Sequence, residues 1–568
     1  MTDLPPGLIL ILGALLVPLL GARLRSIAVL VLTLLSALQI VQLTAGDTLD
    51  LVFFGYQLQP VRVDRLSLIF AYVFHVFAIV CVLGSVHVRE KGQQVSGLLY
   101  AGSAIGAVFA GDLVTLFCYW EITAFTSVFL VWASRTERSY LAGMRYLIIQ
   151  VASGVLLLMG ILLWSRETGS TSLAFENMSS ALTAGSQGAL LILIAFGIKA
   201  AFPLLHGWLV DAYPEGTPTG TVFLSAFTTK MAIYCLARGF AGLPELIWIG
   251  AVMAVFPIVY ALLENDLRRV LAYSLVSQLG IMVTGIGIGS ELAINGVSSH
   301  AFAHVYMLLL FMALGGILFR TGTARATELG GLYRSMPVTA VLCCIGAASI
   351  SAFPLTSGFV SKSMIVSAAA EEHLTWVWFM LMAASAGAFL HTGLKVPYLA
   401  FFGRDSGKRP QESPPPMRLA MGLAALVCIL VGVFPGPLYD ALPHPSDYVP
   451  YTASHVVEQI QVLAFTALGF FFLVRWKPAL FARPGVHLDA DWVYRRFLPG
   501  LTRFAVEWIG ILWNRFLESL LAFLKRGFNA VYRFHGPEGV FARTWSTGSI
   551  ALAAALALGG YILLYFTT

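Results

Sequence analysis

The sequence predicts an all-α polytopic membrane protein without a sizeable soluble domain. Of its 568 residues, 58% are hydrophobic and only 11% are charged, whereas soluble domains carry about 25% charged residues. Apolar runs of about 20 residues, long enough to cross a bilayer as helices, recur from one end of the chain to the other. The net charge of +6 comes from basic residues scattered through short loops. This pattern is typical of a membrane protein and does not indicate a nucleic-acid partner.

The apolar runs give the expected spans and their orientation. The spans are 6–22, 26–45, 66–86, 95–111, 113–134, 140–164, 188–210, 219–238, 244–263, 268–289, 292–319, 337–353, 359–371, 374–403, 417–435, 456–475 and 547–566. One set of loops carries Arg23, Arg25, Arg89, Lys91, Arg135, Arg138, Arg268, Arg269, Arg320, Arg325 and Arg334, and the other carries Arg62, Arg65, Arg166 and Arg238. The richer set is expected in the cytoplasm, which places the N-terminus outside a bacterial inner membrane.

The stretch 191–238 is the centre of this organisation. It is apolar, yet it carries Lys199 and Lys230, and several prolines and glycines interrupt it between them. A lysine inside the hydrocarbon layer is costly, so it marks an ion or proton pathway by default. Broken helices at membrane depth are tolerated where protein or a watery cavity surrounds them. A lysine that snorkels from a helix end is the alternative for each residue.

The phrase at the first break occurs a second time. Residues 201–208 read AFPLLHGW and residues 352–359 read AFPLTSGF, with Lys362 directly after the second copy. Paired interrupted segments in two halves of a chain point to the ion site of a transporter. A chance match of a short apolar phrase is the alternative.

Glu121 lies in the apolar run LVTLFCYWEITAFTSVFLVW. Desolvation there disfavours a charged carboxylate, and a nearby lysine would oppose that effect. A proton relay needs a site of this kind, whose protonation depends on a neighbouring charge. A structural carboxylate hydrogen-bonded inside the bundle is the alternative.

Two histidines, His300 and His304, are four residues apart and are therefore expected on one helical face. A proton-relay pair is favoured because histidine titrates near physiological pH. Metal ligation would need a third ligand, which the sequence does not offer nearby, and neutral core histidines remain an alternative. His391 and Lys395 share another face, where Lys395 is expected near the membrane interface.

No signature of a bound cofactor or metal is found. The sequence has no Walker motif, dinucleotide glycine fingerprint, haem attachment motif or cluster spacing. Its six cysteines lack metal-ligand spacing and are interpreted as buried reduced thiols. Arg268 and Arg269 follow two acidic residues, and a charged loop explains them. The energy for any transport is therefore expected from an ion gradient or from partner subunits.

The tail after about residue 476 differs from the rest. Its apolar residues Leu501, Phe504, Trp508, Leu512, Phe516, Leu520 and Leu524 recur every three or four positions. This period predicts an amphipathic helix along the membrane surface or against a neighbouring subunit, with a helix of a small terminal domain as the alternative. The run 547–566 would anchor it, and the basic, proline-rich stretch 404–418 is expected to be a connector.

Seven phrases between about residues 60 and 400 resemble one family in order. They are VRVDRLSLIF, LVTLFCYWEITAFTSVFL, GIKAAFPLLHGWLVDAYPEGTPT, LSAFTTKMAIYCLARGF, NDLRRVLAYSLVSQLG, HAFAHVYMLLLF and SAFPLTSGFVSKSMI. The chain resembles the antiporter-like subunits shared by Mrp-type cation/proton antiporters and respiratory complex I. The phrase around Lys230 and the PEGTPTGTVF loop look most like the D subunit of the Mrp type.

The resemblance implies a core of about fourteen helices, built from two inverted five-helix repeats with broken helices around a central hydrophilic axis. It implies axis residues on the fifth, seventh, eighth and twelfth helices, at Glu121, Lys199, Lys230 and Lys362, and a family histidine at His300. Where many relatives read HAFFK, this chain reads HAFAH, so His304 replaces a lysine. The terminal amphipathic helix and last span look more like the lateral arm of complex I's distal subunit.

The expected domains are N-terminal membrane helices (1–112), two antiporter-like repeats (113–240 and 241–403), C-terminal membrane helices (404–480), and a lateral helix with a final anchor (481–568). The favoured function is that of an ion-translocating subunit of a multi-subunit antiporter exchanging Na⁺ or K⁺ for H⁺, with other membrane subunits as partners. The first alternative is a proton-pumping membrane arm of a complex I- or hydrogenase-like enzyme. A membrane partner of a soluble inorganic-carbon-uptake protein and a structural scaffold are further alternatives.

Overall fold

The computed structural model describes residues 4–53, 55–170, 172–476, 489, 492–540 and 542–567. The helices are α1 (Leu8–Leu16), α2 (Ala22–Val41), α3 (Arg65–Ser85), α4 (Lys91–Phe109), α5 (Leu113–Trp132), α6 (Glu137–Thr168), α7 (Ser179–Thr183), α8 (Gln187–Ala200), α9 (Gly207–Ala212), α10 (Gly220–Ala226), α11 (Thr228–Gly239), α12 (Pro244–Leu263), α13 (Leu267–Ile288), α14 (Glu291–Ala303), α15 (Val305–Thr321), α16 (Pro337–Ile350), α17 (Ser357–Glu371), α18 (Thr375–Ala388), the π-helical η5 (Phe389–Lys395) and η6 (Tyr398–Phe402), α19 (Pro415–Val433), α20 (Gly436–Asp440), α21 (Ala453–Trp476), α22 (Leu498–His535) and α23 (Thr547–Thr567). Strands β1 (Thr48–Phe53) and β2 (Tyr56–Arg62) form an antiparallel hairpin that the sequence analysis does not predict.

The structure confirms a helical, multi-span membrane protein. Twelve helical stretches of the described residues are long and apolar enough to cross a membrane. Three shorter apolar ones also occur, and two of these, α8 and α16, end directly before the repeated phrase and one residue short of it, respectively. The paired helices α10 and α11 and the helix α13 are enclosed on nearly all sides, whereas α21 is largely exposed. The most enclosed helices therefore form the centre of the bundle.

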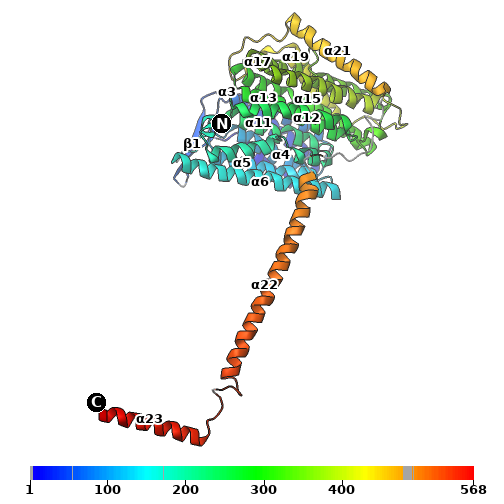
Figure 1. Cartoon of the computed structure of the whole chain (residues 1–568). Coiled ribbons are helices and arrows are strands. Elements are labelled where there is room, and N and C mark those ends of the chain that lie inside the picture. The colour runs from blue at the N-terminus through cyan, green and yellow to red at the C-terminus, as the bar shows by residue number, and fades with distance from the viewer. Residues whose placement is uncertain are drawn as a thin grey trace. The chain divides into compact units, whose positions relative to one another are not determined.

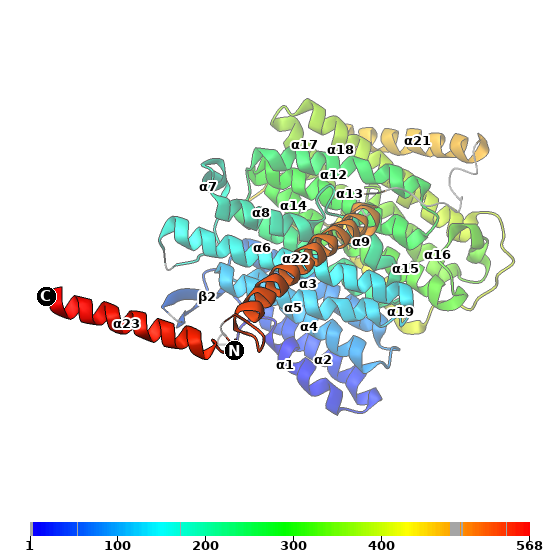
Figure 2. The same cartoon turned by 60° about the horizontal axis from the view of Figure 1, so that its bottom comes forward.

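The chain divides into two compact units, Met1–Ala490 and Asp491–Thr568. The first holds α1 to α21, in which α12 and α13 lie side by side (Figures 1 and 2). The second holds α22, a helix of 38 residues, and α23. These confirm the predicted terminal helix, which is longer than its apolar period indicated, and the predicted last apolar helix.

The two copies of the repeated phrase share one backbone geometry. The alanine and the leucine of each AFPL lie in the left-handed region, with φ of 64° at Ala201, 69° at Leu204, 56° at Ala352 and 70° at Leu355. Such values are uncommon for residues other than glycine. A left-handed residue ends a helix, and the following proline cannot continue it because it lacks an N–H and its ring clashes with the preceding turn. The repeated sequence therefore folds into the same helix break in both halves.

A second pair of matching features precedes the breaks. Asp112 and Asp266 are the N-cap residues of α5 and α13, and each side chain accepts backbone N–H bonds from the first turn. Each aspartate also forms an isolated antiparallel bridge, Asp112 with Ala174 and Asp266 with Arg325. The segment from Asp112 to the first break and the segment from Asp266 to the second break therefore share these two local features.

Two expected continuous spans are interrupted. The span expected at 219–238 ends one helix at Ala226 and starts another at Thr228, and the span expected at 292–319 breaks at His304. Both interruptions lie beside titratable residues. His304 stands between α14 and α15, but its backbone N–H still bonds to the carbonyl of His300 and the two rings pack against each other, as residues on one helical face do.

Candidate functional site

Lys199 lies in the last turn of α8, one residue before the first break. Its Nζ donates to the carbonyl oxygen of Trp120 at 2.6 Å and to Oγ1 of Thr123 at 3.0 Å. It also lies 4.2 Å from the centroid of the Trp120 ring, a cation–π contact. The indole N–H of Trp120 donates to Ser153, whose hydroxyl donates to the carbonyl of Ala195. The lysine is therefore held against α5 by groups whose positions are themselves fixed.

Glu121 follows Trp120 but does not bond to Lys199. Its Oε1 is buried and has no hydrogen-bond partner within the part of the chain that the structure describes. The carboxylate lies directly over Gly154 of α6, where a Cβ atom would overlap it. The charges of Glu121 and Lys199 nevertheless act on each other. The two side chains are therefore close enough to interact electrostatically, but they do not form an ion pair in this structure.

Lys230 stands in the first turn of α11. Its Nζ donates to the carbonyl oxygen of Ser225 at 2.6 Å, across the interruption between α10 and α11. The interruption supplies an acceptor at the point where the buried ammonium needs one. Helix α8, which carries Lys199, packs against α11, which carries Lys230. Lys199 is close enough to Cys235 of α11 for the two groups to interact electrostatically.

His300 and His304 form a ring pair at the second interruption. Their ring centroids are 5.1 Å apart, and Nδ1 of His300 lies 3.0 Å from Oγ of Ser361. Both ring nitrogens of His304 are buried without a partner among the described residues. Lys230 lies close enough for its charge to act on both rings, and so does Lys362. The histidine pair therefore lies within the electrostatic reach of both Lys230 and Lys362.

Lys362 lies in α17, after the second break. Its Nζ donates to the carbonyl oxygen of Ile350 at 2.9 Å. Ile350 ends α16, so its carbonyl has lost its helical partner. All three candidate lysines thus bond to backbone carbonyls, and none has a carboxylate partner in the described ranges. The structure buries Lys199, Lys230, His304, His300 and Lys362, and it leaves Glu121 half-buried at the end of this series next to Lys199.

Two buried cations were missed by sequence reasoning. Arg268, expected to belong to a charged loop, is 2% exposed and donates to the carbonyls of Pro214 and Gly216 at 2.8 and 2.9 Å. It also bonds to the hydroxyl of Thr221. Arg268 therefore fixes the PEGTP loop, which lines a cavity of about 630 Å³. The sequence did hold a sign that Arg268 is buried, because this residue lies in the first turn of an otherwise apolar helix, directly after the N-cap region.

Lys395, expected near the interface, is fully buried. Its Nζ donates to the carbonyl oxygens of Ala261, Leu262 and Glu264 at 2.9, 2.7 and 2.6 Å. It therefore caps the C-terminal end of α12, where carbonyls lack helical partners. Its neighbour His391 is reached by the charge of Lys362 as well.

Further buried polar atoms lack protein partners within the described ranges. They belong to Gln150, Thr229, Ser274, Gln278 and His391. Because buried polar groups are normally hydrogen-bonded, and water serves where protein does not, we expect bound water at these side chains.

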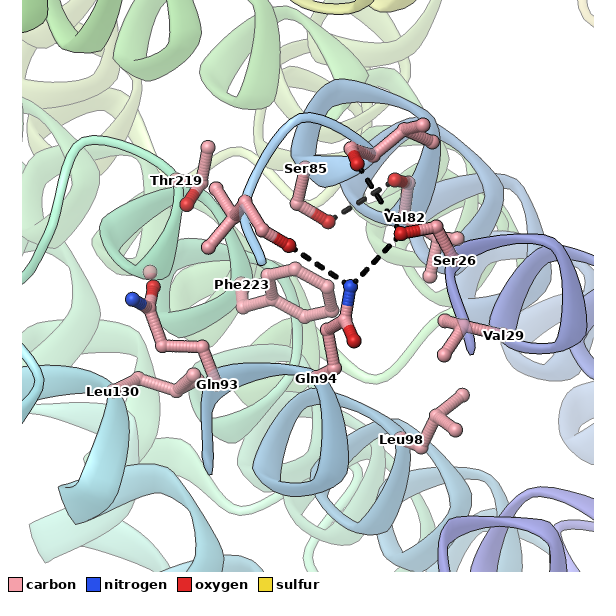
Figure 3. Close-up of a pocket in the computed structure, with 13 residues that line it drawn as sticks. Ser26, Val29, Val82, Ser85, Gln93, Gln94, Leu98, Leu130, Thr219 and Phe223 are labelled. Carbon is pink, nitrogen blue, oxygen red and sulfur yellow. Dashed lines mark hydrogen bonds between the residues drawn. The ribbon is translucent and has the colours of Figure 1, made fainter. Parts of the chain in front are cut away.

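A small pocket among α2, α3, α4 and α10 has a different character (Figure 3). Its volume is about 20 Å³, and the amide of Gln94 donates to Ser26 and to the carbonyl of Val88. Arg25 bonds to Gln94 as well. The dashed lines in Figure 3 join Gln94, Ser26 and Ser85 to partners within the protein, and the lining of the pocket includes none of the predicted site residues, so the pocket is not part of the candidate site.

A helical bundle with broken helices and a buried series of titratable side chains defines a class of membrane proteins that move ions. Residues 110–389 match the protein family described as NADH:quinone oxidoreductase/Mrp antiporter, transmembrane. Hydrogenase-4 component B of Escherichia coli (strain K12) is 30% identical over 450 residues, which cover 71% of this chain and 67% of that protein. The chain therefore belongs to the family of NADH:quinone oxidoreductase and Mrp antiporter membrane subunits.

A relative named for antiport matches over a smaller share of its own length. The A/B subunit of a probable K⁺/H⁺ antiporter of Rhizobium meliloti (strain 1021) is 31% identical over 419 residues, 66% of this chain and 41% of that protein. The chain thus spans less than half of this relative.

Two solved structures share the fold. One is the Mrp complex from Dietzia sp. DQ12-45-1b, with a TM-score of 0.75 at 24% identity over 93% of this chain and 63% of that chain. The other is the membrane-bound sulfane sulfur reductase, an archaeal respiratory membrane complex, with a TM-score of 0.71 at 22% identity over 98% of this chain and 99% of that chain.

Proposed function

We propose that this chain is the ion-translocating subunit of a multi-subunit antiporter that exchanges Na⁺ or K⁺ for H⁺. The observation that carries the proposal is the series of buried lysines, each held at or beside a helix interruption by carbonyl oxygens and none neutralised by a carboxylate among the described residues. Charged groups inside a membrane are expensive and are retained where they serve transport.

The proposed mechanism moves charge along the series from Glu121 to Lys362. Glu121 and Lys199 would alternate between a closed pair and the separated arrangement seen here. Separation favours a proton on Glu121 and disfavours one on Lys199, because each charge loses its counter-charge in a poorly solvated site. A proton leaving Lys199 would be passed to Lys230, then to His304 and His300, and finally to Lys362. The lysine at the far end would release it on the opposite side.

The remaining assignments of the proposal follow the resemblance. Residues 113–240 and 241–403 would act as the two transport halves, and 481–568 as a lateral arm that holds neighbouring membrane subunits. The arginine-rich loops would face the cytoplasm, with the N-terminus outside. The phrase around Lys230 supports a role like that of the D subunit of the Mrp type, although the antiporter relative from Rhizobium meliloti is named as an A/B subunit.

A second candidate function is a proton-pumping membrane subunit of a redox enzyme. The match over two thirds of hydrogenase-4 component B favours it. The same series would then conduct protons, with the driving energy supplied by cluster-binding partner subunits and not by a cation gradient.

The test is cation-dependent dissipation of a pH gradient in inverted vesicles that contain the complete complex, with Lys199→Ala compared with wild type. Dissipation triggered by Na⁺ or K⁺ and lost in the variant supports antiport. The matched control is Lys91→Ala, which removes an exposed lysine. Respiration-linked proton uptake without a cation response would support the redox function, and neither activity would contradict both.

A further inference from the structure

Tyr100 of α4 bonds to the interruption between α10 and α11, at a residue two positions before Lys230. Its side chain is fully buried. The hydroxyl accepts the backbone N–H of Thr228 at 2.9 Å and lies 2.5 Å from Oγ1 of the same residue. The two partners are 128 residues apart in the sequence, so only the folded bundle brings them together. This tyrosine takes no part in the ion series that the proposed function uses.

The tyrosine bond replaces a bond of the helix itself. In an uninterrupted α-helix, each N–H donates to the carbonyl four residues before it. The N–H of Thr228 would then donate within α10, and that of Thr229 would donate to Ser225. Here the Tyr100 hydroxyl takes the N–H of Thr228, and the carbonyl of Ser225 accepts from Lys230 at 2.6 Å. A side chain inserted into the ladder of backbone bonds is a known cause of a helix break. The tyrosine therefore inserts where the lysine needs a carbonyl.

Aromatic packing holds the Tyr100 ring in place. Phe227, which stands between α10 and α11, packs edge-on against Tyr100 and against Phe74 of α3, with ring centroids 5.2 and 5.5 Å apart. Edge-to-face pairs at such distances are favourable. One turn before Tyr100, a Cβ atom at Gly97 would lie 3.1 Å from the ring of Phe223, so α4 approaches α10 closely. A closely packed part of the bundle thus delivers the hydroxyl to the interruption.

Loss of this hydroxyl would leave the N–H of Thr228 without its partner. Because buried N–H groups are normally paired, the chain would recover a bond by closing α10 and α11 into one helix. Closure would also bring the N–H of Thr229 to the carbonyl of Ser225. Lys230 would then lose the acceptor that holds its ammonium group.

We propose that Tyr100 is a positioning residue for Lys230: its hydroxyl keeps α10 and α11 apart, so that the carbonyl of Ser225 stays free to hold the ammonium group. The inference rests on the proposed function, in which Lys230 passes protons, and it adds a residue from a helix outside the ion series. Tyr100 acts through the helix interruption, because its hydroxyl bonds to the backbone of α11.

The first experiment observes the lysine itself and does not require transport. The complete complex is labelled with ¹⁵N at its lysine side chains, and the Nζ signals of Lys230 and Lys199 in solid-state NMR are identified by their loss in Lys230→Met and Lys199→Met. The chemical shift of an ammonium nitrogen responds to the acceptors around it. We expect Tyr100→Phe to move the Lys230 signal and to leave the Lys199 signal in place. An unmoved Lys230 signal would overturn the inference.

Two further variants separate the backbone bond from other effects of the substitution. Tyr213→Phe removes a hydroxyl that is equally buried and has no hydrogen-bond partner among the described residues. Thr228→Val removes Oγ1 but keeps the backbone N–H that Tyr100 accepts. Both variants should leave the Lys230 signal in place. A shift as large as that of Tyr100→Phe in either of them would overturn the role assigned to this bond.

The second experiment measures ion translocation per folded complex in vesicles, with the melting temperature of the purified complex as a check on folding. We expect Tyr100→Phe to lower translocation about tenfold, because misplacing a reacting group by 1 Å can cost as much as 10²-fold. Tyr213→Phe, the matched loss of a buried hydroxyl, should behave as wild type.

The two experiments separate this inference from the proposed function. If wild type moves ions and Tyr100→Phe moves them equally fast, the inference fails alone. If wild type moves neither cations nor protons, the proposed function fails, and the NMR signal alone then decides whether Tyr100 positions Lys230.

Discussion

The ammonium of Lys199 lies 2.6 Å from the carbonyl oxygen of Trp120, the residue directly before Glu121. The lysine thus bonds to the backbone of the helix that carries the carboxylate and not to the carboxylate itself. In the alternation proposed for this pair, the flexible lysine side chain would exchange the carbonyl of Trp120 for the carboxylate of Glu121, the next residue on the same helix.

Glu121→Gln keeps the shape of the side chain and removes its negative charge. We expect ion translocation to fall by about a hundredfold or more, because a positioned proton-transfer group contributes 10²–10⁴ in rate. Translocation is measured in vesicles containing the assembled complex. Glu137→Gln, which alters an exposed carboxylate at the start of α6, is the control. A rate within twofold of wild type would remove Glu121 from the pathway.

Gly154→Ala tests whether the site depends on the close approach of α6. A Cβ atom at this position would overlap Oε1 of Glu121, so the carboxylate must move away from its place beside Lys199. We expect about a tenfold loss of translocation, since misplacing a reacting group by 1 Å can cost as much as 10²-fold. Assembly of the complex should be unaffected. Val155→Ala, on the exposed side of the same helix, should behave as wild type, and equal rates in the two variants would contradict the argument.

Much of this architecture follows from the sequence. The apolar runs and the repeated AFPL phrase predict the spans and both helix breaks, because proline and hydrophobic length act locally along the chain. Lys199, Lys230 and Lys362 stand out in the sequence because each lies in an apolar stretch, where water is not expected to solvate an ammonium group. Their common use of backbone carbonyls was not predictable, since it depends on which carbonyls the breaks leave free.

Other features depend on contacts between distant segments. Arg268 looks like a loop residue beside acidic neighbours, but the PEGTP loop more than 50 residues upstream folds over it. Lys395 looks interfacial because Pro397 follows it, yet the end of α12 supplies three acceptors. A cavity beside Lys362 is lined in part by α21, whose sequence shows only an apolar span. Such pairings are set by tertiary packing, which local periodicity does not encode.

Asp64, the N-cap of α3, should contribute to stability in a pH-dependent way. Burial alone would raise the pKa of this carboxyl, but the charge of Arg238 and the bonds from Ser67 N–H and Arg238 outweigh it and lower the pKa below 3.8. A pKa lower in the folded than in the unfolded chain gives stability that is complete above the unfolded value and is lost as the pH falls through the folded value. Wild type is therefore expected to lose thermal stability below about pH 4, the usual value for Asp.

Asp64→Asn should lower the melting temperature at neutral pH and flatten this acid limb. The measurement is the thermal unfolding of the purified complex between about pH 3 and pH 7, a range that brackets the ordinary Asp titration. Glu245→Gln, an exposed carboxylate in the first turn of α12, should leave both the melting temperature and its acid dependence unchanged. An acid limb of wild-type slope in Asp64→Asn would show that other carboxylates are responsible.

Lys395→Met separates a structural lysine from the lysines of the transport series. The substitution leaves three carbonyls at the end of α12 without their charged donor. Losing hydrogen bonds to a charged group costs ~1.5–3 kcal/mol each in favourable cases, and partial rescue by water should reduce the total to about 2–4 kcal/mol. We expect a lower melting temperature of the purified complex, with ion translocation per folded complex near that of wild type. Lys362→Met should leave the melting temperature near that of wild type, because its lysine bonds to one carbonyl only. It should lower ion translocation, because Lys362 belongs to the proposed transport series. Lys91→Met, at an exposed position, is the control for removal of a lysine, and loss of translocation in folded Lys395→Met complexes would place Lys395 on the ion path.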